Sequence, residues 1–169
     1  MTTCSEQEQR LSISSLELFE GVPASIVAHI EKECTWQRYY AHETILDNGS
    51  QRPHGVYFLV RGEVEILKYG TRDQQQSVAS LTAPDCFGEF GAVTGQPGSA
   101  SVRTTTPCVV AEISSERFLE LLDACPAASL YLLKKTVSLI KNLGDDSVMF
   151  HSAGRVLEAA HRNAILRSL

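Results

Sequence analysis

The chain has 169 residues, of which 43% are hydrophobic and 21% are charged, and its formal net charge is -5. These values fit one domain with an appended segment, large enough to build a core without disulfide bonds. The acidic balance and the absence of a lysine/arginine block argue against nucleic-acid binding. No run of about 18 apolar residues occurs, so we expect no membrane span and a cytoplasmic protein.

The chain is expected to begin with a polar tail, residues 1–10, followed by helical structure over about residues 11–34. Apolar residues recur there at helical spacing, and Pro23 suits the first turn of a helix. Aromatic and β-branched residues then indicate extended structure over about residues 36–46. A turn is predicted at residues 47–50.

The clearest β pattern lies at residues 55–68, where two strands flank the turn at Gly62. The second of these strands alternates Val64 and Ile66, expected to point inward, with glutamates expected to point outward. Further strands are predicted at residues 77–81, 99–104 and 108–113. Several short strands at close spacing indicate a barrel or a sandwich rather than a parallel sheet with crossover helices.

Two helices are predicted after the strands. The first begins after Ser114 or Ser115 and ends near Pro126, and the second covers about residues 127–143. Two apolar seams run along the second helix, one formed by Leu130, Leu133, Val137 and Ile140 and the other by Leu132, Thr136, Leu139 and Leu143. This helix either packs only on its own domain or also forms a homodimer through residues 127–143. Residues 144–169 are expected to form an amphipathic C-terminal extension.

Residues 87–102 carry the most informative pattern, a short strand, a tight turn, one or two helical turns and a second strand. Gly88 and Gly91 flank Glu89 where the short helix would begin, and Gly95 is expected to end it in a left-handed conformation. Free amide groups at a helix start bind small anions, and glycine lets a ligand approach the backbone. Because a carboxylate accepts hydrogen bonds from hydroxyl groups, the pattern indicates a site for a sugar phosphate.

Three segments in this order resemble the cyclic nucleotide-binding domain family, which includes catabolite-activator-type regulators, regulatory subunits of cyclic-nucleotide-dependent kinases and cyclic-nucleotide-gated channels. The segments are residues 56–64, Phe87-Gly88-Glu89 and residues 96–102. The resemblance covers about residues 18–143 and implies a mainly β fold, an eight-stranded antiparallel jelly-roll β-barrel. N-terminal helices, a short cassette helix and C-terminal helices would accompany the barrel. The implied domain spans residues 11–143 and includes the C-terminal helices.

The resemblance also assigns roles within residues 87–102, here called the cassette. Glu89 matches the glutamate that binds the ribose 2′-hydroxyl, and Gly88 matches the glycine against which the ligand lies. Ser99 and Ala100 match positions that face the cyclic phosphate. The complete set of candidate ligand-binding residues is Phe87, Gly88, Glu89, Phe90, Gly91, Gly98, Ser99 and Ala100.

One cassette position departs from the family pattern, because Gly98 stands where an arginine pairs with the phosphate. Such a contact is a charge-assisted hydrogen bond. Losing one partner of a buried charge pair costs about 2–5 kcal/mol, which corresponds to about 30-fold to a few thousand-fold in affinity. The cassette amides and the Ser99 hydroxyl remain, so we expect weakened binding.

Other basic residues were considered as replacements for this arginine. Strand alternation is expected to turn Ser101 and Arg103 outward, which argues against Arg103 as a phosphate ligand. A surface role is expected for Arg61. Arg52, Lys68 and Arg72 lie near predicted loops, and the sequence leaves open whether one of them reaches the phosphate. The sequence also leaves open whether Tyr131 and Lys134, on the second C-terminal helix, face the base of the nucleotide.

Patterns for catalysis and metal binding are missing from the sequence. The five cysteines and five histidines lack zinc spacing, and neither a Gly-x-Ser-x-Gly motif nor a metal-barrel motif occurs. We therefore expect no enzyme, no metal and no cofactor. The thiols are expected to be reduced and mostly buried, with Cys4 exposed on the polar tail.

Two functions remain. The first is a stand-alone regulatory or sensor module that binds a cyclic nucleotide or a related small anion and signals through its C-terminal helices. The alternative is a ligand-free fold that acts as a protein–protein interaction module. The residues after Leu143 are too few for the DNA-binding domain of the regulators, so we expect the module to act on a partner protein.

Overall fold

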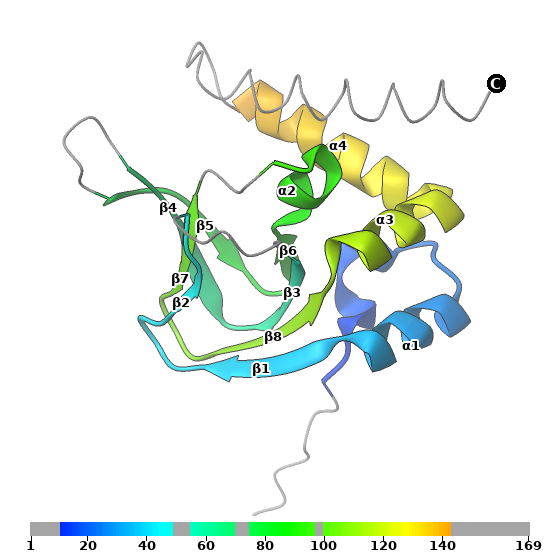
Figure 1. Ribbon diagram of the computed structural model, residues 1–169, viewed down its shortest axis with the longest axis horizontal. Helices are drawn as coiled ribbons and strands as arrows, with labels where there is room; N and C mark the ends of the chain where they lie inside the picture. The colour runs from blue at the N-terminus through cyan, green and yellow to red at the C-terminus, as the bar shows by residue number, and fades with distance from the viewer. Residues whose placement is uncertain (1–10, 49–54, 70–74, 97–99, 143–169) are drawn as a thin grey trace, which may run out of the picture.

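The computed structural model describes residues 11–48, 55–69, 75–96 and 100–142, which form eight strands with helices before, between and after them (Figure 1). The helical elements are η1 (Ile13–Ser15), η2 (Glu17–Phe19), α1 (Ala24–Glu33), α2 (Glu89–Thr94), α3 (Ser115–Ala124) and α4 (Pro126–Asn142). The strands are β1 (Thr35–Tyr39), β2 (Thr44–Leu46), β3 (Val56–Arg61), β4 (Glu63–Tyr69), β5 (Gln75–Thr82), β6 (Asp85–Phe87), β7 (Ser101–Thr104) and β8 (Cys108–Ile113).

The eight strands divide into two antiparallel four-stranded sheets, ordered β1-β8-β3-β6 and β2-β7-β4-β5. This is the strand order of a jelly roll, in which two sheets face each other. The mainly β, eight-stranded jelly-roll prediction is therefore confirmed. Between the described strands, however, the two sheets are separate, so the barrel is not closed by backbone pairing.

Sheet β1-β8-β3-β6 is covered on both faces, and β3 shows why its sequence is apolar throughout. Val56 and Phe58 pack in a cluster with the helices, whereas Tyr57 and Leu59 pack in a second cluster between the two sheets. Successive strand residues point to opposite faces, so a strand buried on both sides needs apolar residues at every position. By contrast, β5 at the edge of the other sheet is exposed along nearly its whole length.

The helices α1, α3 and α4 lie on one side of the molecule, and the short α2 lies between β6 and α4 (Figure 1). Ser114 caps α3 as predicted, because its side chain accepts a hydrogen bond from the backbone N–H of Arg117. Pro126 is the first residue of α4, a position where proline loses no helical hydrogen bond. Both predicted C-terminal helices are confirmed within one residue of their bounds as far as the structure describes them.

Two local predictions needed correction. The helical stretch expected at residues 11–34 is two 3-10 turns followed by α1, because Leu16 and Glu20 adopt extended backbone conformations and Pro23 precedes the first helical residue. The extended segment at 36–46 is divided between β1 and β2, with His42 in a left-handed conformation in the turn between them.

In β4, Val64 points inward as expected, but the alternation does not continue to the end of the strand. The pairing with β5 shifts register between Ile66 and Leu67. Leu67 is therefore buried while Ile66 is only half-buried. A bulge of this kind changes which face a residue takes without leaving a mark in the alternating sequence.

The four described cysteines, Cys34, Cys86, Cys108 and Cys125, are free and buried, as predicted. Cys4, expected to be exposed, lies outside the described residues, as do the turn residues 49–50 and the extension at 144–169. Of the helices that the structure describes, none is both long and apolar enough to cross a membrane.

Candidate functional site

The cassette begins with a turn from β6 into α2 that requires glycine. Gly88 has a φ of 86°, and a Cβ atom there would lie 2.6 Å from the carbonyl oxygen of Gly55 and 3.2 Å from the ring of Tyr57. A side chain would therefore be strained and would collide with the neighbouring backbone. In the described structure, the space beside Gly88 is taken up by close packing against the start of β3.

The apolar cassette residues contribute to packing. The ring of Phe87 is buried and stacks on Tyr57, with ring centroids 5.1 Å apart. Phe90, in the first turn of α2, is half-buried, and its carbonyl oxygen accepts a hydrogen bond from the Thr94 hydroxyl at 2.8 Å. The carbonyl of Gly91 accepts a hydrogen bond from the backbone N–H of Gly95, which ends α2 with a φ of 66°. The predicted left-handed cap at Gly95 is thus confirmed.

Glu89, the first residue of α2, is 2% exposed although it is an acid. Its carboxylate forms an ion pair with Lys135 of α4, with Oε1 and Nζ 3.0 Å apart. A buried carboxylate is strongly disfavoured unless it is paired or hydrogen-bonded, so this contact compensates for the burial of Glu89.

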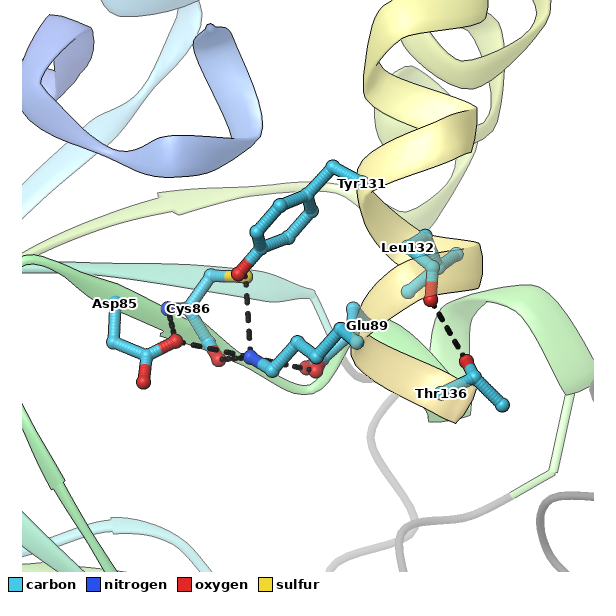
Figure 2. Close-up of polar contacts among 7 residues, drawn as sticks. Asp85, Cys86, Glu89, Tyr131, Leu132 and Thr136 are labelled. Atoms are coloured by element: carbon cyan, nitrogen blue, oxygen red, sulfur yellow. Dashed lines mark hydrogen bonds and ion pairs between the residues drawn. The ribbon is translucent and has the colours of Figure 1, made fainter. Parts of the chain in front are cut away.

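The ammonium group of Lys135 has two further oxygen partners in the same segment of chain. Nζ lies 3.0 Å from Oδ1 of Asp85 and 2.7 Å from the carbonyl oxygen of Cys86. Figure 2 shows Asp85, Cys86 and Glu89 beside α4, with dashed lines from all three meeting at one nitrogen atom. A lysine ammonium has three N–H donors, and three oxygen acceptors face it here.

The charges around this ammonium decide its protonation. Burial lowers the pKa of Lys135, but the attraction of nearby acidic groups, with Glu89 the largest and Asp85 also contributing, outweighs burial. The net pKa therefore lies above that of a free lysine, and the ammonium is charged at neutral pH.

Tyr131 lies one turn before Lys135 on α4, and its hydroxyl is 3.9 Å from Sγ of Cys86 (Figure 2). Burial, together with the nearby Glu89 carboxylate, raises the pKa of the Cys86 thiol to about 12. Burial also raises the pKa of Tyr131. The thiol and the phenol are therefore both neutral in the folded protein at neutral pH, and Lys135 provides the positive charge that α4 presents to this segment.

The phosphate end of the cassette is only partly described. Ala100 is half-buried directly before β7, whereas Gly98 and Ser99 lie outside the described residues. Arg103 points outward as expected and pairs with Glu65 at 2.8 Å. Ser101, also expected outward, is buried.

The burial of Ser101 has a local cause. The residues directly after β2 lie against it: its hydroxyl accepts a hydrogen bond from the backbone N–H of Asn48 and donates one to Asp47 Oδ1 at 3.2 Å. Of the other basic residues considered, Arg61 is exposed, and Arg52 and Arg72 are outside the described residues.

The sequence pointed to Tyr131 and Lys134 on this helix and missed Lys135. Lys134 is exposed, whereas the adjacent Lys135 faces the cassette. A signal was present, because Lys135 follows Tyr131 by four residues and Leu132 by three and so shares their face of α4. A lysine on an otherwise inward-facing stripe indicates a buried acidic partner.

Residues 36–125 match the cyclic nucleotide-binding domain family. This match covers more than half of the 169 residues, and the chain belongs to that family. The chain is 27% identical over 110 residues to the cAMP-activated global transcriptional regulator CRP of Pasteurella multocida, covering 64% of this chain and 52% of that protein. The corresponding regulator of Salmonella typhimurium is 32% identical over 94 residues, covering 55% of this chain and 44% of that protein. The chain thus spans about half the length of these relatives.

A solved structure shares the same fold. The sensor domain of the transcriptional regulator DNR from Pseudomonas aeruginosa matches with a TM-score of 0.67 and 18% identity, covering 80% of this chain and 91% of that one. At this level of identity the match shows the fold alone. By their names, the relatives are regulators rather than enzymes.

Proposed function

We propose that this chain is a regulatory domain that binds a cyclic nucleotide at the cassette and signals through its C-terminal helices. The observation that carries the proposal is the 3.0 Å ion pair between Glu89 and Lys135, which joins the cassette glutamate directly to α4. A ligand that changes the surroundings of Glu89 therefore acts on α4 without any intermediate element. The relatives from Pasteurella multocida and Salmonella typhimurium are named cAMP-activated regulators, which supports this ligand class.

In this proposal, Glu89 accepts a hydrogen bond from the ribose 2′-hydroxyl, and Ser99, Ala100 and backbone amides of the cassette face the cyclic phosphate. Gly88, Phe87, Phe90 and Gly91 shape the turn that presents them. The affinity is expected to be weak because Gly98 provides no cation. The sensing domain covers residues 11–143, and the extension at 144–169 carries the signal or contacts the partner protein.

Calorimetric titration with the 3′,5′-cyclic purine and pyrimidine nucleotides tests this function. We expect weak binding by the natural chain and at least about tenfold tighter binding by Gly98→Arg, a difference of about 1.4 kcal/mol. Gln96→Arg is the matched control, since residue 96 is exposed and the added charge is the same. If none of these nucleotides binds at millimolar concentration to either protein, the sensor function is wrong.

A second candidate is a ligand-free interaction module, favoured by the burial of Glu89 and the absence of the cassette arginine. In this case Glu89 has only a structural role, in its ion pair with α4, and the domain binds another protein instead of a nucleotide. A purified partner whose affinity is unchanged by cyclic nucleotides would support this candidate. Clear nucleotide binding that alters the partner's affinity would support the sensor instead.

The outward face of α4 supports a further proposal, a homodimer through this helix. Leu130, Leu133 and Val137 are 51%, 45% and 39% exposed and follow the i, i+3, i+7 spacing of one helix face. Sedimentation equilibrium of Leu133→Glu, with Lys134→Glu as the control, tests it. We expect the natural chain and the control to dimerise and Leu133→Glu to be monomeric; monomers throughout would contradict the dimer.

A further inference from the structure

We infer that Lys135 is a latch that holds α4 on the ligand-free cassette and that a ligand's ribose hydroxyl must displace. The first half of this inference depends only on the described contacts. The second half rests on the proposed function and names how that same site is regulated. Asp85, Cys86 and Glu89 are the partners that make the latch.

The latch is a single atom with several partners. Lys135 Nζ lies within 3.0 Å of oxygen atoms of Asp85, Cys86 and Glu89, which lie in β6 and at the start of α2. Because one atom makes the three contacts, it cannot leave Glu89 by several ångströms and keep the other two. The contact between this part of α4 and the cassette is therefore made or broken as a unit.

The latch is paired with one oxygen of the carboxylate that a ribose hydroxyl would bind. A hydroxyl bound to a carboxylate lies about 2.5–3.0 Å from the accepting oxygen. Oε1 of Glu89 already has Lys135 Nζ at 3.0 Å, and the Glu89 side chain is only 3% exposed. A ligand hydroxyl can reach this carboxylate only if the groups that bury it move, and Lys135 is one of those groups.

Displacement of Lys135 couples ligand binding to the release of α4. A ligand shifts a conformational equilibrium only by the difference in its affinity for the two states. A ligand with a 2′-hydroxyl gains a hydrogen bond to Glu89 when α4 is released, whereas a 2′-deoxy ligand gains none there. The latch therefore makes release of α4 selective for ligands that carry the 2′-hydroxyl.

The first arm of the test uses the ligand-free, full chain. Amide hydrogen exchange is measured in Lys135→Gln, which removes the charge but keeps a donor, and in Lys134→Gln, its exposed neighbour. We expect exchange in residues 126–142 to rise about 5–150-fold in Lys135→Gln, the usual range for coupled sites. Lys135→Arg, which keeps the charge, should restore most of the protection and so separates loss of the latch from a general folding defect.

The second arm compares 3′,5′-cyclic AMP with its 2′-deoxy analogue by calorimetry. Removal of the latch should raise the affinity for cyclic AMP about 5–150-fold and raise the affinity for the 2′-deoxy analogue less. If α4 loosens and neither nucleotide binds any variant, the latch stands and the sensor function fails. If exchange in α4 is the same in Lys135→Gln and Lys134→Gln, or if both nucleotides gain equally, the inference is overturned.

Discussion

The two faces of α4 differ in what they contact, because the inward face packs on the domain and meets the cassette whereas the outward face is exposed. The inward face carries Leu132 and Thr136, both buried, together with Lys135, whose ammonium contacts the cassette. The outward face carries Leu133 and Val137, which are exposed in the described structure. The same helix thus contacts the cassette on one side and exposes an apolar surface on the other. Substitutions of adjacent residues on α4 can therefore test the two roles separately.

The largest difference is expected between two adjacent leucines. Leu132→Ala removes a buried side chain and should lower the free energy of unfolding by about 2–5 kcal/mol. Leu133→Ala, on the face that is exposed in the single chain, should change the free energy of unfolding of the monomer by less than about 0.5 kcal/mol, measured at a protein concentration low enough to keep the chain monomeric. Urea denaturation followed by circular dichroism measures both. Equal losses would mean that α4 does not have an inner and an outer face.

A double-mutant cycle sharpens the comparison at the charged residues. Lys135→Met and Glu89→Gln, alone and together, should give a coupling energy of about 0.5–3 kcal/mol, because the two groups form one contact. The cycle with Lys134→Met in place of Lys135→Met should give a value within about 0.5 kcal/mol of zero. Thermal unfolding of the five variants and the natural chain supplies the energies. A coupling near zero for Lys135 would show that the ion pair does not join α4 to the cassette.

Alkaline pH should lower the free energy of unfolding through the buried thiol of Cys86. Burial raises the pKa of Cys86 from its usual 9.0 to about 12, so the folded protein keeps the thiol proton at pH values where the unfolded chain has lost it. Stability from this group is complete below pH 9 and falls as the pH rises toward 12. The loss should approach roughly 1 kcal/mol per pH unit.

Urea midpoints at pH 8, 9 and 10 measure this effect, with Cys86→Ala as the comparison. The raised pKa of Cys34 acts in the same direction, so Cys86→Ala should flatten the decline without abolishing it. An unchanged slope in Cys86→Ala would contradict the expected role of this thiol.

The smallest effect is expected from Tyr131→Phe. This change removes only the hydroxyl that lies 3.9 Å from Cys86 Sγ, a long contact to a weak partner. The free energy of unfolding should fall by less than about 1 kcal/mol. A loss above about 2 kcal/mol in thermal unfolding would show that the Tyr131–Cys86 contact, rather than Lys135, holds α4 in place.

Local features of this chain could be predicted from the sequence, and contacts between distant segments could not. The cap at Ser114, the end of α2 at Gly95 and the apolar strand at 56–60 all depend on near neighbours, and the structure confirms them. The two seams of α4 were also visible, but their spacing alone does not tell which one faces the sheet. That choice depends on the packing of Leu132 against the domain.

In the candidate site, too, contacts between distant segments could not be predicted from the sequence. Glu89 was recognised as the cassette acid, but its partner is on another helix, and Asp85 and Lys135 are 50 positions apart in the sequence. Ser101 was expected outward because strand alternation takes no account of the residues after β2 that lie against it. Both cases need the topology of the sheets before the contact can be foreseen.

The most direct measurement of the central claim is a crystal structure of Gly98→Arg with 3′,5′-cyclic AMP bound. The account predicts the ribose 2′-hydroxyl within about 3 Å of a Glu89 carboxylate oxygen, and Lys135 Nζ moved away from Glu89, Asp85 and the Cys86 carbonyl. It would be contradicted by a nucleotide bound in the cassette with the 3.0 Å ion pair between Glu89 and Lys135 still in place.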